Sequence, residues 1–195
     1  FSNIKEILNK AKEYNNFVRI DMEDSSLTTT TIETFKELQK EYDNVGIVVQ
    51  AYLFRTYEDV VSLNKTGTNY RLCKGIYIEP AEIAYKEKQA VRDNYVKTLD
   101  RMLTDGNYVG IATHDKQLLD SAYKLLKDKN IDKSKYEFQM LYGVTEHLRE
   151  KVNNDGHKIR VYVPFGEHWY AYSIRRLQEN PEVAWYITKS VFSFK

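Results

Sequence analysis

The chain has 195 residues, with 29 Lys and Arg against 28 Asp and Glu, so its formal net charge is +1. This even balance removes the electrostatic argument for a nucleic-acid partner or a polybasic membrane site. A hydrophobic content of 42%, with 13% aromatic residues, is typical of a globular protein and excludes a disordered chain.

Targeting features are also missing from the sequence. No stretch approaches the roughly 18 consecutive apolar residues of a membrane-spanning helix, and no signal peptide opens the chain. The single Cys73 cannot form an internal disulfide and fits a reducing compartment. We therefore expect residues 1–195 to form one soluble, cytoplasmic domain.

Six short runs rich in Val, Ile, Tyr and Phe are expected to be strands. They cover residues 17–21, 45–52, 70–75, 108–114, 136–141 and 159–164. Segments with helical spacing lie between these runs, and another precedes the first run at residues 3–14. The alternation predicts an α/β architecture with a parallel sheet.

Two helix starts can be placed from the sequence. Thr30 and Glu33 resemble a capping box at the start of an apolar stripe, and Asp115 is expected to cap a later helix. Apolar residues recur on one face of three helices: Ile32, Phe35 and Leu38; Val91, Tyr95, Leu99 and Met102; Leu118, Leu119, Ala122, Leu125 and Leu126.

Polar residues close each of the six expected strands. In order they are Asp21, Gln50, Arg71 with Lys74, Thr113 with His114, Gln139, and Tyr162. Any one of them could mark a strand that turns polar as it reaches the surface. Because the carboxyl ends of parallel strands carry ligand sites, six such ends together favour one site at a common face.

The glycines decide between an open sheet and a barrel. None of the eight forms the glycine-rich turn that a dinucleotide-binding open sheet carries after its first strand. A barrel is therefore preferred, yet a (β/α)8 barrel has eight strands and takes roughly 250 residues. With six expected strands and a helix at the start, two strand–helix units are expected to be missing from the front.

The sequence carries little evidence for a metal site or for the catalytic motifs of a hydrolase. The histidines His114, His147, His157 and His168 show no ligand spacing, and no nucleophile motif of a hydrolase is present. Acidic residues within residues 19–24 could bind a divalent ion, but a solvated loop is the preferred interpretation. For His114 at a strand end, a structural and a functional role remain equally open.

The segment WYAYSIRRLQEN, residues 169–180, carries the sharpest pattern. Helical spacing places Tyr172, Arg175, Arg176 and Glu179 on roughly one side. Two guanidinium groups can bind one carboxylate or phosphate, and tyrosines can pack against a small apolar ring. The alternative is a solvated helix face with an internal ion pair. The residues alone thus indicate that a small anionic metabolite binds at the mouth of a barrel.

These motifs together resemble the proline dehydrogenase family. IRVYVPFG followed by YAYSIRRLQEN is similar to the family signature, a strand ending in Tyr-x-Pro and then a helix with Y-x-x-R-R-x-x-E. VRIDMED, VVQAYLFRT, YRLCKGIY, GIATHD and YEFQMLYGV resemble the successive strand ends of the family, in the same order, between Phe17 and Asn180. The resemblance implies a (β/α)8 barrel of which about six strand–helix units are visible, with the last helix over the barrel mouth.

The resemblance also implies a reaction and a site. Hydride transfer from L-proline to non-covalently bound FAD would yield 1-pyrroline-5-carboxylate, the first step of proline catabolism to glutamate, with a quinone or another acceptor reoxidising the flavin. No residue is expected to act as a strong base, because the deprotonated amine of proline already favours hydride loss. The residues implied to contact L-proline are Asp21, Tyr77, Leu141, Tyr162, Tyr172, Arg175 and Arg176. Those implied to surround FAD are Gln50, Arg71, Lys74, Thr113, His114, Gln139 and Glu179.

Two departures from the family pattern leave alternatives open. The family's first two strands, which supply a lysine to the substrate carboxylate, have no counterpart before Phe17, and Ile76 stands where alanine is commoner. One alternative is a flavin-free barrel that acts on another small carboxylate or a phosphate ester. The other is a ligand-binding or purely structural barrel fragment that has lost catalysis together with its front strands. The quinone acceptor further implies peripheral contact with the inner face of a membrane.

Overall fold

All six expected runs form strands in the computed structural model, which describes residues 1–163 and 166–167. The strands are β1 (Val18–Ile20), β2 (Val45–Gln50), β3 (Asn69–Cys73), β4 (Tyr108–Ala112), β5 (Tyr136–Leu141) and β6 (Ile159–Tyr162). They form one sheet in the order β1-β2-β3-β4-β5-β6, and every neighbouring pair is parallel. The described strands therefore follow one another across the sheet in chain order.

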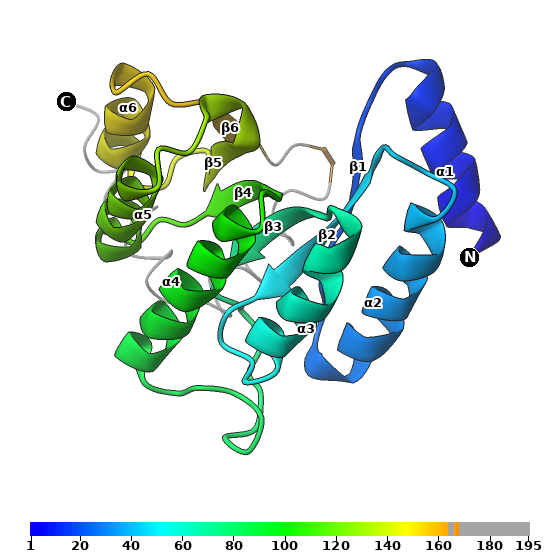
Figure 1. The fold of residues 1–195 in the computed structure, drawn as a ribbon, viewed down its shortest axis with the longest axis horizontal. Coiled ribbons are helices and arrows are strands. Elements are labelled where there is room, and N and C mark those ends of the chain that lie inside the picture. Colours follow the sequence, from blue (N-terminus) through cyan, green and yellow to red (C-terminus); the bar gives the residue numbers. More distant parts are fainter. Residues whose placement is uncertain (164–165, 168–195) are drawn as a thin grey trace.

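The helices are α1 (Ser2–Glu13), α2 (Ser25–Gln39), α3 (Thr56–Leu63), α4 (Lys88–Thr104), α5 (Lys116–Asp128) and α6 (Glu146–Asn154), with short 3-10 turns at Asn64–Thr66 and Lys133–Lys135. Connections between neighbouring parallel strands are almost always right-handed, so α2 to α6, which connect the strands, fall on one face of the sheet. Figure 1 shows them lying along the outside of the strands. The predicted α/β fold class of the (β/α)8 type is confirmed, with six parallel strands curled as a half-barrel and helices following the first five of them in the described residues.

Alternation along β3 shows how the sheet divides its two faces. Tyr70 and Leu72 are fully buried, and the hydroxyl of Tyr95 on α4 donates a hydrogen bond to the carbonyl of Leu72 at 3.1 Å. Arg71 and Cys73 are only partly buried, on the opposite face. Because strand side chains alternate, the apolar face packs under the helices and the polar face turns into the barrel.

One helix start differs from the sequence-based expectation. α2 begins at Ser25, and the carboxylate of Asp24 accepts a hydrogen bond from the Ser26 amide at 2.9 Å. The prediction of a cap at Thr30 was therefore wrong, because Asp24 already caps the helix nearer the start of the chain. The cap expected at Asp115 is confirmed, since its carboxylate accepts from the Gln117 amide at 3.1 Å. In the described part of the chain no helix is long and apolar enough to cross a bilayer.

Candidate functional site

A cavity of about 860 Å³ opens at the carboxyl ends of the strands, on the inner face of the sheet. Side chains from β1, β3, β4, β5 and β6 or from the residues that follow them contribute to its wall. The wall includes eight of the predicted site residues: Asp21, Arg71, Lys74, Thr113, His114, Gln139, Leu141 and Tyr162. Parallel pairing in register brings these residues together although they are spread over more than 140 positions.

The charged residues in the described wall of this cavity are mostly basic. Its charged residues are Arg19, Arg71, Lys74, Arg92, Lys116 and Arg160 on the basic side and Asp21 and Asp115 on the acidic side. Burial, opposed by the charge of Glu137 and assisted by that of Arg71, lowers the pKa of Arg19 to about 10. Excess positive charge in a partly buried cavity favours an anionic ligand.

Arg71 on β3 and Asp21 after β1 form an ion pair across the inner face of the sheet. One guanidinium nitrogen of Arg71 lies 3.6 Å from the Asp21 carboxylate. The Nε atom of Arg71 is buried and has no hydrogen-bond partner among the described residues. A buried donor without a partner is costly, so this atom is available to a ligand acceptor.

Lys74 is held by a buried carboxylate. The side chain of Asp115, only 8% exposed, lies 2.8 Å from Nε of Arg92 and 3.4 Å from Nζ of Lys74. Burial by itself would raise the pKa of Asp115, but the hydrogen bond from Arg92 and the charge of Lys74 outweigh it and hold this pKa below its ordinary value. Asp115 therefore stays ionised while it caps α5 and orients two cations.

His114 is engaged through both ring nitrogens. The Leu141 amide donates to Nε2 at 3.1 Å, and Nδ1 lies 3.0 Å from the hydroxyl of Thr145. Burial, followed by the charges of Lys74 and Arg71, lowers the pKa of His114 to about 4. The ring is therefore neutral at physiological pH and joins the end of β4 to the end of β5.

A glycine makes room for Gln139. The side-chain amide of Gln139 on β5 lies against Gly110 on β4, where a Cβ atom would be only 2.5 Å from Nε2 of Gln139. The same Nε2 donates a hydrogen bond to the Glu137 carboxylate at 2.7 Å. Glu137 is itself only 1% exposed and is paired with Arg160 at 2.7 Å. The Gln139 amide thus occupies the space left by the missing side chain of Gly110, and any larger residue at position 110 would fill that space.

Two predicted site residues do not line the cavity. Gln50 is buried, and its amide nitrogen donates to the carbonyl of Met22 at 3.2 Å, while its Oε1 has no partner among the described residues. Tyr77 lies on the loop between β3 and α4, and its hydroxyl donates to the carboxylate of Glu23. The backbone reaches this loop through Gly75 at φ +103°, where a Cβ atom would collide with the ring of Tyr52 at 2.1 Å.

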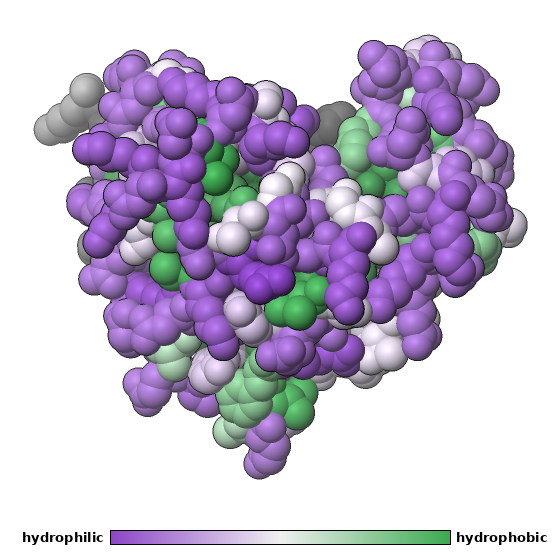
Figure 2. Space-filling model, viewed as in Figure 1, coloured by the Kyte–Doolittle hydropathy of each residue, from purple (hydrophilic) through white to green (hydrophobic). Residues whose placement is uncertain are grey.

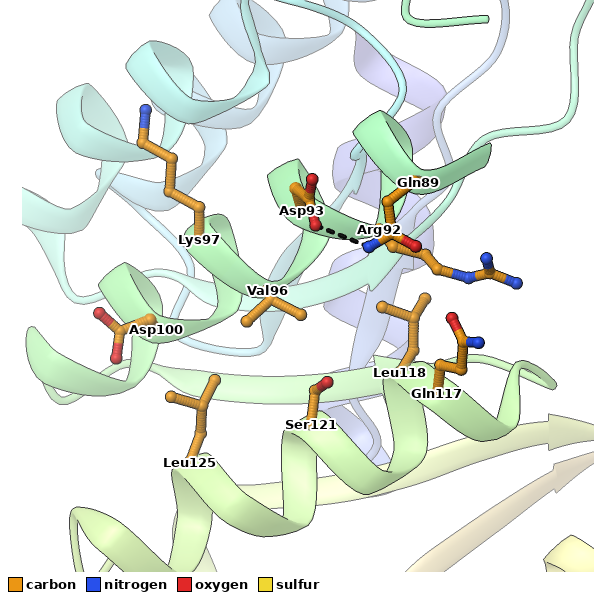
Figure 3. Close-up of a pocket in the computed structure, with 10 residues that line it drawn as sticks. All are labelled: Gln89, Arg92, Asp93, Val96, Lys97, Asp100, Gln117, Leu118, Ser121 and Leu125. Carbon is orange, nitrogen blue, oxygen red and sulfur yellow. Dashed lines mark hydrogen bonds between the residues drawn. The ribbon is translucent and has the colours of Figure 1, made fainter. Parts of the chain in front are cut away.

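A second hollow, of about 490 Å³, lies between α4 and α5 on the outside of the sheet (Figure 3). Val96, Leu118 and Leu125 face one another across it, and Gln89 donates to Asp93 at 2.8 Å. None of the predicted site residues lines it. This groove is therefore a junction between two helices and lies apart from the predicted chemistry.

The remaining predictions concern metal binding and the last helix. Within residues 1–163 and 166–167 no group of three or more His, Cys, Asp or Glu could hold a metal ion. Tyr172, Arg175, Arg176 and Glu179 lie outside the described residues, as do His168 and the predicted helix over the barrel mouth.

Sequence reasoning did not identify Arg92 or Thr145 as part of the site. Arg92 meets Asp115 across a separation of 23 residues, which no local pattern shows. Thr145 precedes a helix and would be interpreted as an ordinary cap. The only signal in the sequence is position. Arg92 lies near the start of the helix that follows β3, and Thr145 directly precedes the helix that follows β5.

The sequence also matches known proteins. The sequence model of the family described as "Proline dehydrogenase" matches residues 3–187. Proline dehydrogenase of Deinococcus radiodurans is 39% identical over 192 residues, covering 97% of this chain and 62% of that protein. Proline dehydrogenase 2 of Bacillus subtilis strain 168 is 40% identical over 181 residues, covering 93% of this chain and 60% of that protein. The chain thus spans about three fifths of the length of these relatives.

A solved structure shares the fold. The crystal structure of proline utilization A (PutA) from Bdellovibrio bacteriovorus, inactivated by N-propargylglycine, superposes with a TM-score of 0.84 at 33% identity. The match covers 92% of this chain and 21% of that one. With the family model spanning nearly the whole sequence, the chain belongs to the proline dehydrogenase family, which is flavin-dependent.

Proposed function

We propose that the protein to which these residues belong oxidises L-proline to 1-pyrroline-5-carboxylate with FAD, the first step of proline catabolism to glutamate. The observation that carries the proposal is the basic cavity at the strand ends, lined by eight of the residues that match the family's site. The proposed proline contacts are Asp21, Leu141, Tyr162 and Tyr77, together with Tyr172, Arg175 and Arg176 outside the described residues. In this proposal residues 1–195 are part of one barrel domain.

FAD fits the groups that the cavity offers. Organic cofactors occupy pockets of about 300–1,000 Å³, and this cavity falls within that range. In the cavity wall, Arg71 Nε supplies a buried donor that has no partner among the described residues. The proposed FAD contacts are Gln50, Arg71, Lys74, Thr113, His114 and Gln139, with Glu179 outside the described residues. When bound, FAD would supply the hydride acceptor.

The chain's own residues would bind and orient the reactants. The guanidinium of Arg71 is the cation suited to stabilise an electron-rich reduced flavin ring. Neutral His114 and buried Thr113 form part of the cavity wall. Since the deprotonated amine of proline favours hydride loss, binding and orientation are the main contribution required of the protein.

The test is an anaerobic visible spectrum of the purified protein with FAD, before and after L-proline. We expect bound flavin whose absorbance bleaches with L-proline and stays unchanged with an acyclic amino acid. Bound flavin without bleaching would contradict proline oxidation. Lack of bound flavin would favour a flavin-free barrel that binds another small carboxylate or a phosphate ester.

A cytoplasmic location with peripheral membrane contact, where a quinone or another acceptor would reoxidise the flavin, completes the proposal. Ile78 is 96% exposed on the loop between β3 and α4, and Phe54 and Ile83 are exposed beside it. Figure 2 shows apolar side chains gathered over this loop at the lower end of the view.

Ile78→Asp is expected to reduce sedimentation with phospholipid vesicles. Tyr14→Asp, exposed near the opposite ends of the strands, is the control. Equal sedimentation of both variants would contradict contact through this loop.

A further inference from the structure

Thr145, the last residue of the turn between β5 and α6, has a strained backbone. Its φ of +47° and ψ of +50° place it in the left-handed region, and its side chain is buried. The other non-glycine residues with positive φ in the described chain are Asn15 and Asn130, a residue type that tolerates this conformation. A β-branched residue there is an outlier, and such strain persists only where the surroundings require it.

The hydroxyl of Thr145 is not used in the ordinary way. Thr145 occupies the position before α6, where a threonine normally caps the helix by accepting from an amide of its first turn. Here the side chain makes no cap hydrogen bond, and its Oγ1 lies 3.0 Å from Nδ1 of His114. The turn therefore directs the hydroxyl at the histidine and leaves the helix without a side-chain cap.

The backbone fixes which nitrogen of His114 carries the proton. An amide N–H can only donate, so Nε2, 3.1 Å from the Leu141 nitrogen, must present its lone pair. In the neutral ring the proton is then on Nδ1, where it is donated to Thr145 Oγ1. Both ring nitrogens are occupied, and the positive charges of Lys74 and Arg71 oppose protonation of the ring.

We infer that Thr145 is a positioning residue: its hydroxyl accepts the Nδ1 proton and thereby holds the His114 ring in the orientation in which Nε2 accepts from the Leu141 amide, and the ring in turn keeps that amide and the adjoining wall of the cavity in place. His114 acts through its fixed orientation and donates no proton during the reaction. The link to proline rests on the proposed function, because Leu141 is a proposed contact of the substrate. The tautomer itself can be measured without substrate.

Three substitutions separate this role from that of a simple turn residue. Thr145→Ser keeps the hydroxyl, Thr145→Val keeps the shape without it, and Thr145→Gly relieves the strained backbone and removes the hydroxyl. Each is compared with the wild type by 15N NMR of the His114 ring in the resting full-length protein with flavin bound, and then by steady-state kinetics with L-proline.

The serine variant is expected to keep the Nδ1–H signature and the KM of the wild type. The valine and glycine variants are expected to show a mixture of tautomers and a KM raised about tenfold, the effect of one lost hydrogen bond, with a smaller change in kcat. A glycine variant with the wild-type signature and KM would overturn the inference, because the residue would then serve only the turn. A protein that never bleaches with proline would defeat the proposed function, while the NMR result would still decide the tautomer.

Discussion

Glu79, on the loop between β3 and α4, accepts two hydrogen bonds from Ser25, from its amide at 2.7 Å and from its hydroxyl at 2.5 Å. Ser25 is the first residue of α2, so a carboxylate from a distant loop satisfies the positive end of this helix. Two residues earlier on the same loop, Tyr77 donates to Glu23. The two contacts fasten the loop after β3 to the loop after β1, which carries Asp21.

We expect Glu79→Ala to lower the free energy of unfolding by about 2–3 kcal/mol, because it removes charge-assisted hydrogen bonds from a buried site. The KM for L-proline should rise as well, since the loop that carries Tyr77 loses an anchor. Glu82→Ala, on the exposed part of the same loop, is the matched control. Denaturant unfolding and steady-state kinetics measure both effects. Equal stabilities of the two variants would show that the loop does not depend on this contact.

The Asp115 carboxylate combines a helix cap with two ion pairs, and its loss should therefore cost more than an ordinary cap. Asp115→Ala removes the hydrogen bond to the Gln117 amide and leaves Arg92 and Lys74 without their anion. We expect a loss of about 3 kcal/mol or more in the free energy of unfolding.

Asp132 provides the comparison for this prediction. Its carboxylate accepts from the Ser134 amide at 2.7 Å at an exposed 3-10 turn. Asp132→Ala should cost about 1 kcal/mol, the usual value of a cap. Flavin affinity should fall only in the Asp115 variant, because Lys74 lines the cavity. If both substitutions cost the same, the ion pairs contribute little.

Local patterns in the sequence were sufficient for the strands and for most of the cavity wall. The six runs were found because apolar residues of a buried parallel strand stand next to each other, and their ends were found because they turn polar. Arg71 and Gln139 lie two residues before the ends of β3 and β5, yet alternation still turns both into the barrel.

Contacts between distant segments could not be predicted in this way. The start of α2 was misplaced because four threonines in a row, with a glutamate after them, resemble a cap, while Asp24 and the buried Glu79 set the true start. The pairing of Arg92 with Asp115 and of Thr145 with His114 depends on how the strand ends converge. A strained φ such as that of Thr145 is a property of the folded chain and has no sequence signature.

The neutral state of His114 makes stability depend on pH. Burial, then the charges of Lys74 and Arg71 at the end of the neighbouring strand β3, lower the pKa of His114 to about 4, while an unfolded histidine has a pKa of about 6.5. Between these values the unfolded chain binds a proton that the native state does not, so stability falls as the pH falls from 6.5 toward 4. The resulting contribution of His114 to the free energy of unfolding is at most about 3 kcal/mol, and it is fully present above pH 6.5.

His114→Gln should therefore flatten the pH dependence of the unfolding free energy between pH 6.5 and 4. Denaturant unfolding at several pH values measures this, and the difference from the wild type cancels the other titrating groups. His147→Gln, on the exposed side of α6, controls for the loss of a histidine as such. Parallel curves for the wild type and His114→Gln would mean that the native ring is protonated like an unfolded one.

Gly110→Ala tests whether the position of Gln139 matters for flavin binding. The new Cβ atom would lie 2.5 Å from Nε2 and 2.9 Å from Cδ of Gln139, so the flexible amide must move and lose its bond to Glu137. No positive φ opposes alanine at position 110. We therefore expect a stability loss of only about 1 kcal/mol but an FAD dissociation constant raised about tenfold, equivalent to about 1.4 kcal/mol.

A double-mutant cycle assigns this effect to its cause. If Gly110→Ala acts only by displacing Gln139, it should have little further effect on FAD affinity in a Gln139→Ala background. Equilibrium titration with FAD of the two single variants and the double variant gives the coupling. Additive losses would show that the methyl group obstructs the cavity directly. In that case the glycine would be required for the close approach of the cofactor to β4, independently of the Gln139 amide.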